Sequence, residues 1–124
     1  MTIIEAINQN DALKSNAYSQ EDKVAWLSRL DWIIKKQIID THEGADSVSV
    51  TGYDDSTEPH TVLLVPAPYD EIYLRWLEAQ INYANGEIDK YNSAITMFNT
   101  AFEAYENHYH RNHMPLSKGS LFLF

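Results

Sequence analysis

The chain has 124 residues, the size of one domain, and 44% of them are hydrophobic, which is enough to bury a core. It contains no cysteine, which excludes disulfides, thiolate zinc sites and iron–sulfur clusters. The net charge is −9, and residues 43–73 hold seven acids and no lysine or arginine. Such a charge disfavours a dedicated DNA- or RNA-binding role.

The N-terminal region predicts no targeting or membrane segment. It lacks the basic and apolar regions of a secretory signal, and no stretch approaches the roughly 20 apolar residues that span a membrane. We therefore expect a soluble protein that is made in the cytoplasm. Residues 1–18 predict a short apolar turn, at Ile3, Ile4 and Ile7, followed by a polar connector.

A long helix is predicted over residues 20–41. Ser19 is a suitable N-cap, Asp22 stands three residues further in the capping-box position, and Gly44 follows the expected end. The apolar residues of the main stripe recur at spacings of 1, 3 and 4. They are Trp26, Leu27, Leu30, Ile33, Ile34 and Ile38.

The same helix carries apolar residues on a second side. At 100° per residue, Ala25, Trp32 and Ile39 fall nearly opposite the main stripe. A helix that is apolar on two sides is usually covered on both. These three residues therefore predict a subunit interface, and a loop or tail lying over Trp32 is the alternative.

Residues 45–66 predict a β-hairpin-like arm inserted between helices. Val48 and Val50 alternate with serines, and residues 61–65 are mostly β-branched or apolar. The acidic segment from Gly52 to Pro59 lies between these runs and has the composition of a turn.

Residues 69–112 carry the longest helical pattern. Eleven apolar or aromatic positions follow alternating steps of three and four, which indicates helix-on-helix packing. They are Leu74, Leu77, Ile81, Ala84, Ile88, Tyr91, Ile95, Phe98, Phe102, Tyr105 and Tyr109. Asn85-Gly86 interrupts the pattern with a turn signal. The unbroken phase favours one long bent helix, whereas compactness favours a helical hairpin turning at Asn85-Gly86, which we prefer.

The predicted fold is therefore mainly α: a small helical bundle with an inserted arm, in one domain of residues 1–113. Residues 114–124 predict an extended C-terminal tail, because Met114-Pro115 ends the last helix and Gly119 lies in a spacer. The tail closes with Leu121, Phe122, Leu123 and Phe124, which are costly to leave in water. They either fold back on the core or bind a partner.

Residues that could carry chemistry are sparse. His108, His110 and His113 suggest a metal site, but on a helix only His110 and His113 share a face. Asp54, Asp55 and Glu58 lack the ligand spacing of a calcium loop. No phosphate-binding loop or hydrolase motif is present. We expect no metal, no cofactor and no enzymatic activity.

Several motifs spread over nearly the whole chain resemble a group of small phage and prophage proteins. They are Thr41-His42-Glu43-Gly44, Thr51-Gly52-Tyr53-Asp54, Leu63-Leu64-Val65-Pro66-Ala67-Pro68-Tyr69-Asp70-Glu71, Glu78-Ala79-Gln80-Ile81, Asn85-Gly86-Glu87, Lys90-Tyr91-Asn92 and Tyr109-His110-Arg111-Asn112-His113-Met114-Pro115. This group is similar to the head–tail connector (adaptor, head-completion) proteins of long-tailed phages.

The resemblance implies a mostly helical virion structural protein without catalytic residues. Proteins of that family form a ring, usually of twelve copies, between the portal protein and the stopper or tail-side neck proteins, and DNA passes through it. In such a ring we expect Tyr53, Asp54 and Asp55 of the arm to contact a neighbouring subunit or the next ring, and residues 121–124 to bind the portal. The alternatives are a soluble helical protein-binding module, such as a regulator or anti-defence factor, and an assembly chaperone.

Overall fold

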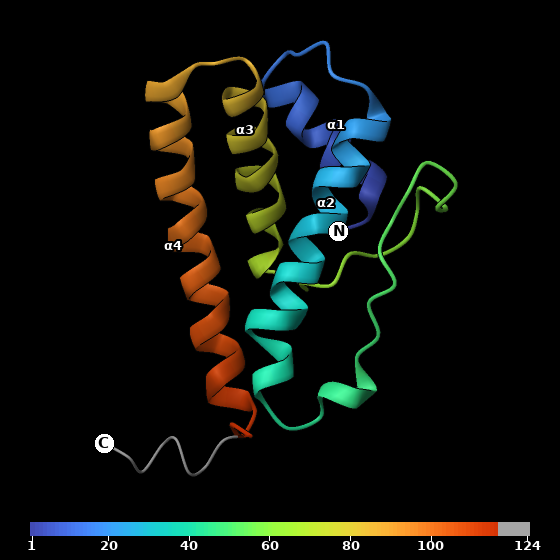
Figure 1. The fold of residues 1–124 in the computed structure, drawn as a ribbon, viewed down its shortest axis with the longest axis vertical. Coiled ribbons are helices and arrows are strands. Elements are labelled where there is room, and N and C mark those ends of the chain that lie inside the picture. The colour runs from blue at the N-terminus through green and yellow to red at the C-terminus, as the bar shows by residue number, and fades with distance from the viewer. Residues whose placement is uncertain (117–124) are drawn as a thin grey trace.

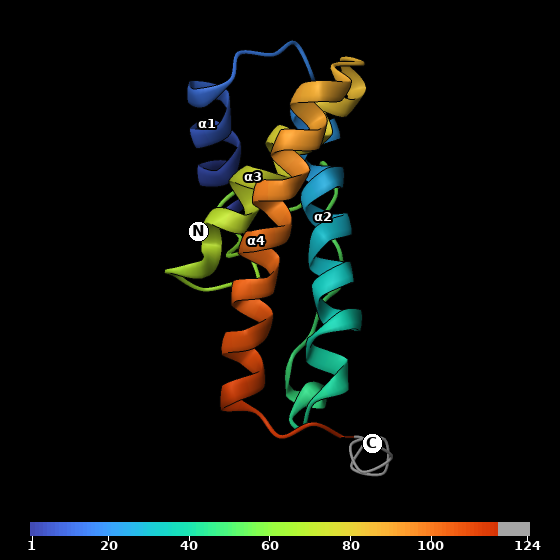
Figure 2. The ribbon, with the colours of Figure 1, turned by 90° about the vertical axis from the view of Figure 1, so that its left-hand side faces the viewer.

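The computed structural model describes residues 1–116, which fold as a small four-helix bundle (Figure 1). The helices are α1 (Ile3–Leu13), α2 (Gln20–Gln37), α3 (Ile72–Ala84) and α4 (Ile88–Asn112), with short 3-10 turns η1 (Ile39–Thr41), η2 (Ala45–Ser47) and η3 (Tyr69–Glu71). Helix α3 is central and contacts the other three helices. Figure 2 shows α2 and α4 as the two long elements of the bundle, with α1 near its upper end. The mainly α class is confirmed.

The first helix is longer than the turn expected from the sequence. Thr2 and Glu5 form a reciprocal capping box, in which each side chain accepts a hydrogen bond from the backbone N–H of the other residue. The helix then continues to Leu13 and buries Ile3, Ala6, Ile7 and Asn10 at helical spacing.

Helix α2 begins as predicted and ends earlier. The Ser19 Oγ accepts from the Asp22 N–H at 3.1 Å, so Ser19 is the N-cap. The α-helix stops at Gln37 and the chain tightens into η1. Ile39 is consequently only 1% exposed and belongs to the core. The prediction that Ile39 lies at a subunit interface is wrong, because the rotation of 100° per residue does not continue past Gln37.

Helices α3 and α4 form the predicted hairpin at Asn85-Gly86. Gly86 has φ +75°, a conformation that favours glycine, and the Glu87 N–H donates to the Asn82 carbonyl. The Tyr18 hydroxyl donates to Asn85 Oδ1 at 2.6 Å. This bond joins the α1–α2 connection to the hairpin turn.

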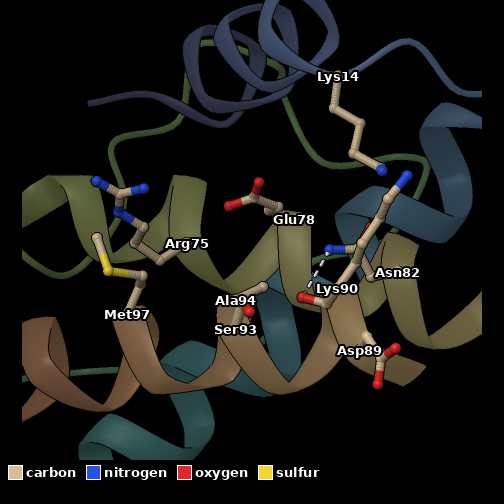
Figure 3. Close-up of a pocket in the computed structure, with 9 residues that line it drawn as sticks. All are labelled: Lys14, Arg75, Glu78, Asn82, Asp89, Lys90, Ser93, Ala94 and Met97. Carbon is tan, nitrogen blue, oxygen red and sulfur yellow. Dashed lines mark hydrogen bonds between the residues drawn. The ribbon is translucent and has the colours of Figure 1, made fainter. Parts of the chain in front are cut away.

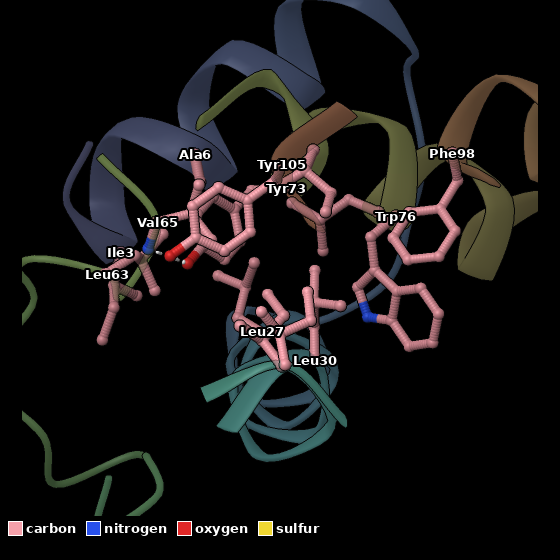
Figure 4. Close-up of a cluster of buried hydrophobic side chains, with 14 of the residues drawn as sticks. Ile3, Ala6, Leu27, Leu30, Leu63, Val65, Tyr73, Trp76, Phe98 and Tyr105 are labelled. Atoms are coloured by element: carbon pink, nitrogen blue, oxygen red, sulfur yellow. Dashed lines mark hydrogen bonds between the residues drawn. The ribbon is translucent and has the colours of Figure 1, made fainter. Parts of the chain in front are cut away.

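The core lies between α2, α3 and α4 and includes Ile3, Ala6 and Ile7 of α1. Figure 4 shows Leu27 and Leu30 of α2 facing Tyr73 and Trp76 of α3. The Trp76 ring packs on Phe98 of α4 with centroids 5.0 Å apart, and its Nε1 donates to the Trp26 carbonyl at 2.8 Å. The buried large side chains of the seam are Leu77, Ile81, Phe98, Tyr105 and Tyr109.

Residues 48–68, which we call the connection, contain no strand, so the predicted β-hairpin-like arm is wrong. The two halves of the connection do not pair with each other. The second half pairs with the N-terminus instead, because the Leu63 N–H donates to the Met1 carbonyl and the Ile3 N–H donates to the Thr61 carbonyl. Leu63 and Val65 are buried in the core. The β-branched run is therefore a strap across the bundle.

The predicted tail begins in contact with the bundle. The Glu43 N–H donates to the Met114 carbonyl at 2.7 Å, and the Leu116 N–H donates to the Thr41 carbonyl at 3.0 Å. Residues 114–116 thus leave the fold beside the end of η1. The apolar run 121–124 lies outside the described residues.

Candidate interaction surface

A buried carboxylate fastens the connection to the bundle. Asp31 of α2 is fully buried and accepts hydrogen bonds from the Tyr73 hydroxyl at 2.6 Å, the Tyr53 hydroxyl at 2.5 Å and the Leu64 N–H at 3.2 Å. The Tyr73 hydroxyl in turn accepts from the Val65 N–H at 2.7 Å. This set, the Asp31 cluster, joins α2, α3 and both halves of the connection.

Burial dominates the electrostatics of the Asp31 cluster. It raises the pKa of Asp31 above its ordinary value, against the lowering effect of the hydrogen bonds from Tyr53, Tyr73 and Leu64. Burial also raises the pKa of both tyrosines, and the hydrogen bonds to Asp31 raise them further. Both phenols therefore stay protonated and keep donating to Asp31. We assign the cluster a structural role.

The three predicted arm residues differ in their exposure and contacts. Tyr53 is an anchor, because its N–H donates to Ser28 Oγ at 2.8 Å and its hydroxyl donates to Asp31. Asp54 and Asp55 are exposed. Asp54 Oδ1 accepts from the N–H and the hydroxyl of Ser56, and these bonds lower its pKa. The structure therefore leaves two carboxylates of the acidic turn open to solvent.

One face of α2 is exposed and carries both apolar and basic side chains. Its members follow steps of three and four and are Ala25, Arg29, Trp32 and Lys36, which we call the α2 face. Trp32 is 41% exposed. The connection lies against one edge of the Trp32 ring. Gly52 is so close to Trp32 Nε1 that a side chain at position 52 would not fit. The loop that was the alternative for Trp32 thus covers part of its ring, and the subunit interface stays a prediction.

Replacing Gly52 with alanine tests this contact. Gly52 has φ +82°, and a Cβ would meet Trp32 Nε1 at 3.0 Å and Ser28 Oγ at 3.2 Å. We expect Gly52→Ala to lower the free energy of unfolding by about 2 kcal/mol, from left-handed strain and overpacking together. Urea denaturation measures the change. Gly44→Ala is the matched control, because Gly44 has φ +84° with open space around it and loses only the strain contribution of about 1 kcal/mol. Equal losses would contradict the contact.

Acidic side chains gather beside the α2 face. Between residues 43 and 73 the chain has no lysine or arginine. The exposed acids of this stretch are Glu43, Asp46, Asp54, Asp55 and Glu58, and a sixth, Glu71, lies apart from them at the start of α3. Figure 1 shows the connection running along the side of the bundle away from α4. A face with Arg29 and Lys36 therefore adjoins an acidic segment.

Of the histidines singled out in the sequence, His110 lies beside His42, a contact that the sequence did not predict. His42 is buried, and its Nδ1 lies 2.6 Å from the Ile38 carbonyl while its Nε2 lies 3.1 Å from His110 Nδ1. Since a carbonyl only accepts, His42 carries its proton on Nδ1, and in the neutral ring Nε2 accepts from His110. His113 instead stacks on Tyr109, with ring centroids 3.8 Å apart. These contacts close the lower end of the bundle.

A groove crosses α3 between α1 and α4. Two cavities of about 460 and 430 Å³ share Lys14, Arg75 and Glu78 as lining residues, and together they form what we call the α3 groove. Figure 3 shows Glu78 between Arg75 and Asn82, with Lys14, the residue that follows α1, above them. The other lining residues are Asn10, Leu13, Glu71, Leu74, Asn82, Asp89, Lys90, Ser93, Ala94 and Met97. Sequence patterns did not predict this groove, because its shape depends on how three helices pack.

One rim of the α3 groove is an ion-pair network. Glu87 lies 2.7 Å from Lys90 Nζ and 3.6 Å from Lys14 Nζ. The hydrogen bond from Lys90 is the main cause that lowers the pKa of Glu87 to about 2. Glu87 therefore stays ionised at neutral pH and can pair with both lysines.

The chain matches no family model, no curated protein and no solved structure. Within residues 1–116, no group of three or more histidine or acidic side chains is placed to hold a metal ion. In the same part of the chain no helix is both long and apolar enough to cross a membrane.

Proposed function

We propose that this chain is a virion structural protein, a head–tail adaptor that forms a ring between the portal protein and the tail-side neck proteins. The motifs from Thr41 to Pro115 that resemble connector proteins motivate the proposal. The α2 face beside the acidic connection is the observation that supports it most directly, because it offers the kind of surface that a ring requires.

A closed ring needs two different surfaces on each subunit that complement each other. The α2 face carries Trp32, Arg29 and Lys36, and the connection carries Asp54 and Asp55. The basic and apolar face of one copy can therefore contact the acidic segment of the next. Tryptophan and arginine are the side chains that most often dominate the binding free energy of an interface.

The acidic surface also suits the passage of DNA. Besides Asp54 and Asp55, the exposed acids on and just before the connection are Glu43, Asp46 and Glu58, and residues 43–73 hold no lysine or arginine. A lumen lined by these side chains would repel the phosphate backbone and let DNA slide without binding. In this proposal the ring has twelve copies, lies in the neck of the virion and assembles in the host cytoplasm.

Co-expression with the portal protein of the same phage tests the proposal. We expect the purified complex to have the mass of a portal ring plus about twelve copies of this chain, measured by light scattering. A chain that leaves the portal unbound would contradict the adaptor. Binding of one host protein at equal stoichiometry would instead support the protein-binding module.

A further inference from the structure

The α3 groove presents unburied apolar surface next to charged side chains. Leu13 is 77% exposed and Met97 is 48% exposed, and they line the two cavities that form the groove. The aliphatic stems of Lys14 and Arg75 extend this apolar floor. The groove can therefore hold apolar side chains along its length.

Two buried asparagine side chains in the groove each have one amide atom without a hydrogen-bond partner. Asn10 Nδ2 and Asn82 Oδ1 are the buried side-chain atoms of residues 1–116 for which no partner is found. Each asparagine is only 2% exposed, and each lines one of the two cavities. The other end of the Asn82 amide is occupied, because Nδ2 donates to the Lys90 carbonyl at 3.3 Å. Asn10 Nδ2 therefore remains as a free donor and Asn82 Oδ1 as a free acceptor. The main chain of a bound peptide offers one carbonyl and one N–H per residue, which are the groups that these two atoms need.

We propose that the α3 groove binds residues 121–124 of a second copy of this chain. Leu121, Phe122, Leu123 and Phe124 would pack against Leu13, Met97 and the lysine and arginine stems. Their main chain would supply a carbonyl to Asn10 and an N–H to Asn82. This inference deepens the proposed ring and rests on it, and it gives the apolar run a receptor on the chain itself rather than on the portal.

The short length of chain after Leu116 favours binding of residues 121–124 to the groove of a second copy rather than to the groove of their own chain. Leu116 leaves the bundle beside Thr41, at the end of the molecule where α4 also finishes (Figure 1). Asn82 donates to the carbonyl of Lys90, which lies 22 residues before Asn112 on α4, a distance of about 33 Å along the helix axis. Phe124, the last residue of the run, follows Leu116 by eight residues, which span at most about 29 Å. The run therefore cannot reach Asn82 of its own chain, whereas the tail of a neighbour can.

Disulfide cross-linking tests the contact cleanly, because the chain has no cysteine of its own. Met97→Cys and Leu123→Cys are made in two otherwise complete chains that carry tags of different size. The chains are mixed, oxidised mildly and separated without reductant. We expect a cross-linked heterodimer at a yield at least fivefold above that from Val62→Cys with Leu123→Cys. Val62 is the matched control, since it is a 69% exposed apolar residue outside the groove.

Leu13→Glu added to the Met97→Cys chain should reduce the cross-link to the control yield, because it places a charge on the groove floor. Equal yields at positions 62 and 97 would overturn the inference. So would a Met97→Cys/Leu123→Cys double variant that closes its disulfide within one chain. A complex that has ring mass on the portal but shows no cross-link would overturn this contact and leave the adaptor intact. A strong cross-link without portal binding would support the contact and contradict the adaptor.

Discussion

Replacing Asp31 with alanine should lower the free energy of unfolding by about 3 kcal/mol. The change removes the acceptor of the Tyr73 hydroxyl, which is buried, and of the Tyr53 hydroxyl and the Leu64 N–H. Each buried donor that loses its partner costs about 1–3 kcal/mol. Equilibrium urea denaturation, followed by circular dichroism, measures the loss.

The Asp31 effect should also be local. The Leu64 amide should lose hydrogen-exchange protection before amides in the middle of α3, because the connection is released from α2 first. Asp55→Ala is the matched control, since Asp55 is exposed, and we expect it to change the free energy of unfolding by less than about 0.5 kcal/mol. A loss below about 1 kcal/mol for Asp31→Ala would show that the cluster does not hold the fold.

Replacing Trp32 with aspartate should weaken assembly on the portal at least about tenfold, which corresponds to about 1.4 kcal/mol. The side chain is 41% exposed in the single chain, so an interface can still bury a large part of it. The new charge would also face the acidic connection of the neighbouring copy. Sedimentation of mixtures with the portal protein measures the change.

The stability of the Trp32→Asp chain separates assembly from folding. We expect its free energy of unfolding to fall by about 1 kcal/mol, from the lost contact with Gly52. Tyr83→Asp is the matched control, since Tyr83 is a 64% exposed aromatic residue beside the hairpin turn and away from the α2 face. If both variants assemble like the unmodified chain, the α2 face is not a subunit interface.

Local signals in the sequence predicted the helices well. Ser19 caps α2 through a contact three residues away, and Asn85-Gly86 turns the chain between α3 and α4. Both features depend on neighbours in the chain. The reciprocal capping of Thr2 and Glu5 is a signal of the same kind, and it would have lengthened the expected N-terminal turn into α1.

Long-range contacts explain what the sequence did not predict. Residues 61–65 have the composition of a strand, but backbone hydrogen bonds join them to Met1 and Ile3. Leu63 and Val65 are buried in the core. In the sequence, Asp31 cannot be told from any other acid on an amphipathic helix. Its role depends on hydrogen bonds from Tyr53 and Tyr73, which lie 22 and 42 residues further along the chain. Of the predicted surface residues, Ala25, Trp32, Asp54 and Asp55 are exposed. Ile39 is buried in the core, and Tyr53 is half-buried and bonded to Asp31.

Electron microscopy of particles from a phage that lacks this gene tests the adaptor proposal most directly. We expect DNA-filled heads and separate tails, with joining restored when the unmodified protein is supplied in the host. We also expect to find the protein in complete virions at about twelve copies each. Normal tailed particles without the gene, or complete virions that do not contain the protein, would contradict the account.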